Sequence, residues 1–251
     1  MAYYPHRSIV PLVQAVIKAA EQLHSPGALQ PVVDQLLQLD SVAQLGYNPS
    51  QAFHTRLPSD QISYLPIGRD PGRWSLGCFV FAPFAKMPLH DHPGMHGFAR
   101  IIEGSLCVST YDWAQGSTEG QAGGQATMKS VDEWLHAPAL TCVHPSEGNL
   151  HELSAGANGC VMLDALLPDY DDEHGRPCSF YMPRDAHLSE HNGRYTTPQR
   201  DDTNARQGET ITLVDASDLM EDEVIAESAF PGGCTPIRME EWPPCDAMEN
   251  A

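Results

Sequence analysis

Two histidines in the segment His90-Asp91-His92 are spaced as a pair of metal ligands would be. Successive side chains of a β-strand point to opposite faces, so both imidazoles point the same way if this segment is extended. Pro88 and Pro93 on either side of the pair favour a strand near a barrel mouth over a helix interior. The pair can therefore offer two nitrogen ligands to one metal ion, although surface or structural histidines would explain it equally well.

A third candidate ligand is His151, where the turn Gly148-Asn149-Leu150 enters an alternating stretch. Three neutral imidazoles on one side of a metal leave its other positions open, which suits a substrate and a gas better than a closed structural site. His96 is expected to support this site or to line its entrance. His136 and His144 have no partner at ligand spacing and are interpreted as structural.

The composition excludes several classes of protein. The chain has 251 residues and a net charge of −19, from 14 Lys and Arg against 33 Asp and Glu. This acidity disfavours nucleic acid and anionic lipid as partners. No apolar run is long enough to span a membrane, and the start resembles no secretory signal, so we expect a cytoplasmic protein that can also be nuclear. The seven scattered cysteines contain no CxxC pair and indicate reduced thiols.

The first part of the chain predicts two helices that pack on the remainder. Residues 8–24 carry apolar side chains at helical spacing, with Ser8 as the N-cap. A second amphipathic segment follows at 28–45, after the break Ser25-Pro26-Gly27. We therefore assign residues 1–46 to a helical segment that covers the next domain, and give it no chemistry.

The middle of the chain predicts a mainly β sandwich or barrel, because short apolar or alternating runs are separated by Gly, Pro and Asp. The expected strands are 76–81, 98–102, 106–111, 161–167 and a returning strand at 209–214. Residues 114–126 are interpreted as a mobile surface excursion. The polar stretch at about 183–208 is interpreted as a long surface connection.

The histidines and glycines partly fit the general cupin pattern. Gly104 and the Gly148/His151 pair stand at the expected positions. The carboxylate ligand of that pattern is missing, because Gly97 stands where the glutamate belongs. A site with three imidazoles and no carboxylate is therefore expected.

The ordered set of motifs resembles the thiol dioxygenase family that contains cysteamine dioxygenase and the plant cysteine oxidases. The motifs that carry it are His90-Asp91-His92-Pro93-Gly94-Met95, Tyr111-Asp112, Gly148-Asn149-Leu150-His151, Asp164-x5-Tyr170 and Gly175-Arg176-x-Cys178. The similarity runs from about residue 62 to 181, with weaker echoes in the N-terminal helices and at residues 234–236.

The resemblance implies a cupin double-stranded β-helix (a jelly-roll barrel) over residues 47–251, with Fe(II) held by His90, His92 and His151. Such enzymes convert an amino-thiol to its sulfinic acid with O₂, and the substrate is cysteamine or the N-terminal cysteine of a protein or peptide. A neutral three-histidine shell leaves the full charge of the ion to attract a thiolate. The family analogy favours N-terminal cysteine as the substrate, which would be an oxygen-sensing step. We also expect a monomer.

Two further residues are implied to be catalytic. Asp164 lies among apolar neighbours, where a carboxylate is costly unless paired, and the resemblance gives it a role in orienting the substrate amine or a water. The alternative is a carboxylate that fixes a turn. Tyr170 matches a tyrosine near the substrate pocket, where its hydroxyl could bond the bound oxygen or amine. The alternative is an aromatic lid on a loop.

The sequence departs from the family at two places. Some animal members carry a Cys-x-Tyr pair that forms a thioether crosslink, but here the positions are Cys178 and Phe180. Tyr181 would face away in an extended segment, so we expect no crosslink. Asp169 stands where the family usually has a second proline, which changes the loop and the fit of the substrate.

Other residues have simpler interpretations. Arg100 is either a solvated charge or a partner for a pocket carboxylate, and the tryptophans at 74, 113 and 134 are expected to pack in the core or under loops. Two other functions stay open: a cupin that uses another metal, and a non-catalytic cupin that acts as a binding module. Iron content and thiol-dependent O₂ uptake distinguish these from a dioxygenase.

Overall fold

The computed structural model describes residues 7–45, 57, 61–114, 124–184, 189–191, 194–196, 207–217 and 225–227. The expected domain boundary at residue 46, most of the excursion at 114–126, much of the connection at 183–208 and the echo at 234–236 lie outside these residues. The division into a helical segment and a cupin domain therefore stays a prediction.

The predicted N-terminal helical pair is confirmed. Helix α1 spans Val10–Glu21 and helix α2 spans Gln30–Leu37, with short 3-10 turns at Arg7–Ile9 and Val42–Leu45. The N-cap prediction is wrong, because Ile9 occupies the N-cap without a side-chain hydrogen bond and Ser8 lies in the preceding turn. Neither helix is long and apolar enough to cross a lipid bilayer.

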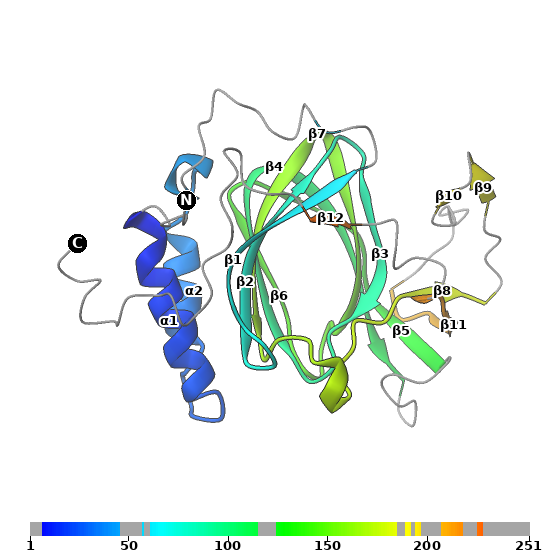
Figure 1. Cartoon of the computed structure of the whole chain (residues 1–251). Coiled ribbons are helices and arrows are strands. Elements are labelled where there is room, and N and C mark those ends of the chain that lie inside the picture. Colours follow the sequence, from blue (N-terminus) through cyan, green and yellow to red (C-terminus); the bar gives the residue numbers. More distant parts are fainter. Residues whose placement is uncertain are drawn as a thin grey trace.

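The predicted mainly β barrel is also confirmed. Figure 1 shows strongly curved strands around a central space, with both helices against one side. The strands are β1 (Ile62–Asp70), β2 (Trp74–Phe81), β3 (Lys86–Asp91), β4 (His96–Trp113), β5 (Gly124–His136), β6 (Ala139–Val143), β7 (Leu150–Leu167), β8 (Tyr181–Pro183), β9 (Ser189–His191), β10 (Arg194–Thr196), β11 (Thr210–Asp215) and β12 (Ile225–Glu227). The main sheet has the order β12-β1-β2-β7-β4-β5-β11-β8, in which β3 also pairs with β7 and β6 with β4.

Two long strands carry the barrel. β4 and β7 each have 18 residues and pair antiparallel, so the separate strands predicted at 98–102 and 106–111 are halves of one strand. The register between the two strands is irregular on both sides of Gly104, and Gly104 and the nearby Gly159 both have positive φ. A Cβ on Gly104 would lie 2.0 Å from the Gly159 carbonyl oxygen, so the crossing requires glycine.

The two faces of β7 serve different purposes. Leu163 and Ala165 pack in the cluster that includes the helices, whereas Cys160 and Met162 belong to the cluster inside the barrel. Since side chains alternate along a strand, Asp164 points to the inside. The barrel interior therefore contains the one carboxylate of this stretch.

Arg100 differs from both expectations. It is only 5% exposed, and its Nε donates a hydrogen bond to the Leu39 carbonyl at 2.8 Å. Arg100 therefore lies on the helix side of β4, where it fastens the end of the helical pair to the sheet. It neither faces solvent nor pairs with a pocket carboxylate.

The edges of the barrel correct two further predictions. Residues 124–126 belong to β5 and pair with β11, so the surface excursion is shorter than predicted, while the returning strand is confirmed as β11. Trp74 is buried and Trp113 packs edge-on against Tyr181, as expected, but Trp134 is half-exposed. No disulfide joins the five cysteines within the described ranges.

Candidate metal centre

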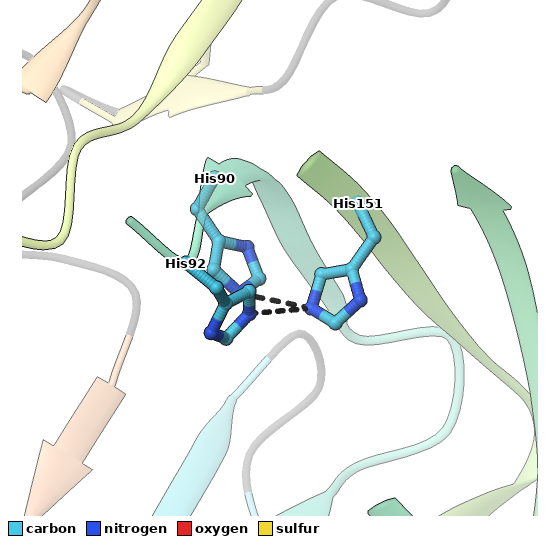
Figure 2. A group of neighbouring side chains, drawn as sticks. All are labelled: His90, His92 and His151. Atoms are coloured by element: carbon cyan, nitrogen blue, oxygen red, sulfur yellow. Dashed lines mark hydrogen bonds between the residues drawn. The ribbon is translucent and has the colours of Figure 1, made fainter. Parts of the chain in front are cut away.

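The structure brings His90, His92 and His151 together. His90 is on β3 and pairs directly with His151 on β7, while His92 follows the end of β3. The Nε2 atom of His151 lies 3.1 Å from that of His90 and 3.1 Å from that of His92. Figure 2 shows the three rings turned toward one point. The candidate ligand atoms lie within 4.8 Å of one another.

Burial keeps these rings uncharged. All three side chains are at most 9% exposed. Burial lowers the pKa of His90 to about 4, and burial together with the neighbouring histidines lowers the pKa of His92 and His151 well below the usual value. Neutral imidazoles have the lone pairs that a metal ion needs. The environment of the group therefore disfavours protonation of the rings and leaves their nitrogens able to bind a metal cation.

The outer nitrogens of two rings are fixed by hydrogen bonds. His90 Nδ1 donates to the Pro88 carbonyl at 2.8 Å, which leaves its Nε2 free to bind metal. Tyr170 Oη lies 3.0 Å from His92 Nδ1 and 2.7 Å from the Asp91 carbonyl. Because the carbonyl can only accept, the phenol donates to Asp91 and accepts from His92 Nδ1. Such outer contacts set the tautomer and orientation of metal ligands.

Tyr170 is thus placed behind His92, bonded to its outer nitrogen and to a carbonyl. The roles expected for it, a bond to bound oxygen or to the substrate amine, remain predictions.

The sequence analysis did not identify the structural role of Asp91. Its carboxylate is fully buried and accepts hydrogen bonds from the Ser179 amide at 3.0 Å and the Tyr181 hydroxyl at 2.9 Å. These bonds hold the segment 179–181 against β3, with the Phe180 ring 5.9 Å from the His90 ring. The alternation of His90, Asp91 and His92 contained the signal, because it places the carboxylate opposite the two imidazoles.

Asn149 is a second missed residue. It is buried, and its Nδ2 donates to the carbonyls of His92 and His144. Its own backbone carbonyl accepts from the His92 amide at 3.1 Å. Asn149 therefore ties the end of β3 to the start of β7, where the third imidazole stands.

No carboxylate completes the group. Among the described residues the three histidines form the one cluster of three or more metal-binding side chains. A Cβ on Gly97 would lie 2.8 Å from Val143 Cγ2 and 3.1 Å from Leu166 Cδ2. Apolar side chains thus occupy the space that a glutamate at this position would need.

The three nitrogens fit a metal ion. With bonds of about 2.1 Å, nitrogens 3.1 Å apart subtend about 95° at the ion. Angles near 90° are those between adjacent positions of an octahedral ion, and three protein ligands leave its other positions open.

Asp164 lies within β7, opposite Gly77 and Ala99, so the alternative of a turn-fixing carboxylate is wrong. Burial and the nearby Asp169 raise the pKa of Asp164 to about 7. Its charge also contributes to the raised pKa of Tyr64 and of Tyr170. The carboxyl group therefore lies inside the barrel near the phenol that supports His92.

Asp169, which stands where the family usually has a second proline, anchors the loop after β7. Its buried carboxylate pairs with Arg69 Nε and accepts a hydrogen bond from Ser75 Oγ at 2.9 Å. An ion pair to β1 and a bond to β2 therefore anchor the residue that precedes Tyr170.

The other histidines whose side chains the structure describes are not part of the group. His96 contacts His144 rather than the three-histidine cluster. His136 is exposed and stacks on Trp134. The expectation that His96 lines the entrance or supports the site stays a prediction.

Comparison with known proteins identifies curated relatives that are named as a dioxygenase and an oxidase. The chain is 29% identical over 129 residues to "Probable 2-aminoethanethiol dioxygenase" of Dictyostelium discoideum, covering 49% of this chain and 56% of that protein. It is 30% identical over 138 residues to "Plant cysteine oxidase 1" of Arabidopsis thaliana, covering 54% and 46%. The chain thus spans about half the length of these curated relatives.

A cupin superfamily protein from Desulfitobacterium hafniense is similar in structure, with a TM-score of 0.34, 14% identity and coverage of 47% of this chain and 88% of that one. The family model PCO_ADO matches residues 32–232, which is most of the chain and includes all three histidines. This protein is a member of the PCO_ADO family.

Proposed function

We propose that this protein is an Fe(II)-dependent thiol dioxygenase that converts an amino-thiol to its sulfinic acid. The reaction is R–SH + O₂ → R–SO₂H, in which sulfur is oxidised and both oxygen atoms are retained. The observation that carries the proposal is the convergence of three neutral Nε2 atoms without a carboxylate, in a chain of this family.

The donor set suits the ion and the substrate. His90, His92 and His151 would hold the iron, and because none of them is charged, the site keeps a positive charge for a thiolate. When bound, a ferrous ion supplies the one-electron chemistry that lets dioxygen react with a thiolate. The two reactants would then be held side by side, which makes the attack intramolecular.

The protein residues around the centre position these groups. Tyr170 fixes the tautomer of His92, and Asp91 keeps Phe180 beside His90. Asp164 offers a carboxyl group that can be charged or protonated near neutral pH. We assign Asp164 the task of holding the substrate amine, or a water, by a hydrogen bond.

For the substrate, we favour the N-terminal cysteine of a protein or peptide over cysteamine. Both present the same two-carbon amino-thiol, so a site that binds the amine and the sulfur accepts either. The named activities of the two relatives cover both classes. An oxygen-sensing role in the cytoplasm follows from the first choice and stays a prediction.

The test is mass spectrometry after aerobic incubation of the iron-loaded protein with cysteamine and with a Cys-initiated peptide in parallel. We expect a gain of two oxygen atoms on the peptide thiol, with His92→Ala as the inactive control. A gain on cysteamine alone would reverse the substrate choice. No gain on either, from protein with full iron content, would reject the dioxygenase and favour a cupin that acts as a binding module.

A further inference from the structure

A second histidine pair lies at the rim of the barrel. His96 begins β4, and His144 follows the end of β6, which pairs with the same part of β4. The two Nδ1 atoms are 3.4 Å apart, and the rings meet edge to face with centroids 5.6 Å apart. Gly97 pairs with Val143, so the two histidines are the next residues along neighbouring strands.

The separation of the two nitrogens is compatible with a long N–H···N contact, and it is also short enough for both atoms to bind one cation. With metal–nitrogen bonds of about 2.05 Å, atoms 3.4 Å apart subtend about 110° at the ion, which is the tetrahedral angle.

The charge state also suits a cation. Partial burial and the neighbouring His144 lower the pKa of His96. His144 is exposed, and it lies in a protein with a net charge of −19, which attracts cations to the surface.

The pair is held in place by the backbone. The amide of His144 donates to the Glu147 carbonyl at 2.9 Å, and the amide of Glu147 donates back at 3.3 Å, which closes the turn. Asn149 Nδ2 donates to the His144 carbonyl at 3.2 Å and also to the His92 carbonyl. The rim pair and the three-histidine centre therefore share a buried amide.

We propose that His96 and His144 form a second metal site, separate from the three-histidine centre, that binds a tetrahedral divalent cation of the zinc type. Two ligands come from the protein. No third metal-binding side chain among the described residues is within reach, so the other two positions accept water or a ligand from solution, such as a thiolate.

The test measures zinc stoichiometry in the full chain. Metal-free protein is equilibrated with Zn²⁺ against a weak competing chelator, and bound zinc is counted by mass spectrometry of the metal. We expect two Zn²⁺ per chain for the wild type and one for His144→Ala. His136→Ala, which removes another exposed histidine, should keep two. Equal zinc content in the wild type and His144→Ala would overturn the proposal.

Three further variants locate the second ion. His92→Ala should lose the other equivalent and keep the rim ion, so this result does not depend on whether the three-histidine centre performs the proposed reaction. Co²⁺ should give the intense visible absorption of a tetrahedral site, and His96→Ala should remove it. Loss of the same ion in Cys142→Ser, which removes an exposed thiol two residues before His144, would assign it to the thiol and overturn the proposal.

Discussion

The two histidine groups of this protein differ in every respect except residue type. The inner group has three buried rings in which His151 Nε2 lies 3.1 Å from each of the other two Nε2 atoms, and two of these rings are fixed from behind by a carbonyl and a phenol. The rim pair has one partly buried and one exposed ring, with nitrogens 3.4 Å apart. The separations at His151 suit adjacent positions of an octahedral ion, and the separation in the rim pair suits two positions of a tetrahedral ion.

The difference shows what an oxidation site requires beyond ligands. Burial keeps the inner rings neutral, and the outer contacts keep their Nε2 atoms pointed at one place. The rim pair has the ligands without the enclosure, so water reaches whatever binds there. We therefore expect redox chemistry at the inner group only.

The largest effect should follow from His151→Ala. This variant removes one of three ligands, so we expect loss of bound iron and a fall in sulfinate formation well beyond the 10- to 100-fold typical of supporting residues. Iron content and product mass measure both. His144→Ala should retain the iron, and His136→Ala should retain iron and activity. A His151→Ala protein that still forms sulfinate would refute the assignment of the inner group.

Asp164→Asn should come next. The amide keeps the shape of the carboxyl group but cannot carry charge or release a proton, so we expect normal iron content and turnover reduced by about 100-fold, as for the loss of an acid–base group. Steady-state O₂ uptake measures the turnover. Asp172→Asn, at an exposed site, is the matched control. Unchanged turnover would show that Asp164 belongs to the wall of the barrel and not to the reaction.

Tyr170→Phe tests the support of the inner group. It removes the hydroxyl between His92 Nδ1 and the Asp91 carbonyl and leaves the ring in place. We expect a 10- to 100-fold loss of iron affinity, with a smaller loss of turnover once the iron is saturating. Tyr111→Phe is the control, since its hydroxyl bonds Glu152 instead. A loss of turnover at full iron occupancy would instead favour a direct contact between Tyr170 and the reactants.

Sequence reasoning found His90 and His92 because their signal is local, and it found His151, 59 residues after His92, through the cupin pattern of Gly148 and His151. His90 and His92 share a face through strand alternation, and Gly97 marks the missing carboxylate. The same reasoning missed Arg100, which bonds a carbonyl 61 positions earlier, and the rim pair, whose members are 48 residues apart. Contacts of this kind depend on how β4 lies beside β6 and the helices, which no local pattern specifies.

The fold was predictable to a similar degree. Helical spacing and β-rich runs predict the class, but Gly104 was not interpreted as a point within one continuous strand. Its partner, Gly159, comes from the other long strand, so the close approach that demands glycine is visible only in three dimensions.

The pH dependence of stability should also separate the barrel interior from the surface. The pKa of Asp164 is raised from 3.8 to about 7 by burial, so its protonated form favours the folded state. That contribution is fully present below about pH 4 and is lost as the pH rises through 7. Asp164→Asn should therefore melt at a higher temperature than the wild type at pH 8, with the difference vanishing near pH 4. A constant difference across this range would contradict the raised pKa.

The smallest effect is expected at Gly97, where the inner group lacks its fourth ligand. Gly97→Ala places a Cβ 2.8 Å from Val143 Cγ2, and we expect a loss of about 1 kcal/mol in the free energy of unfolding, at the low end for overpacked cores. Urea unfolding of Gly97→Ala, Val143→Ala and the double variant measures the contact, because the double variant should lose less than the sum. If the losses simply add, the space beside Gly97 is open. A Gly97→Glu variant would then have room to place a carboxylate next to the three histidines. In that case the absence of a carboxylate at position 97 would reflect the chemistry of the site and not the packing around it.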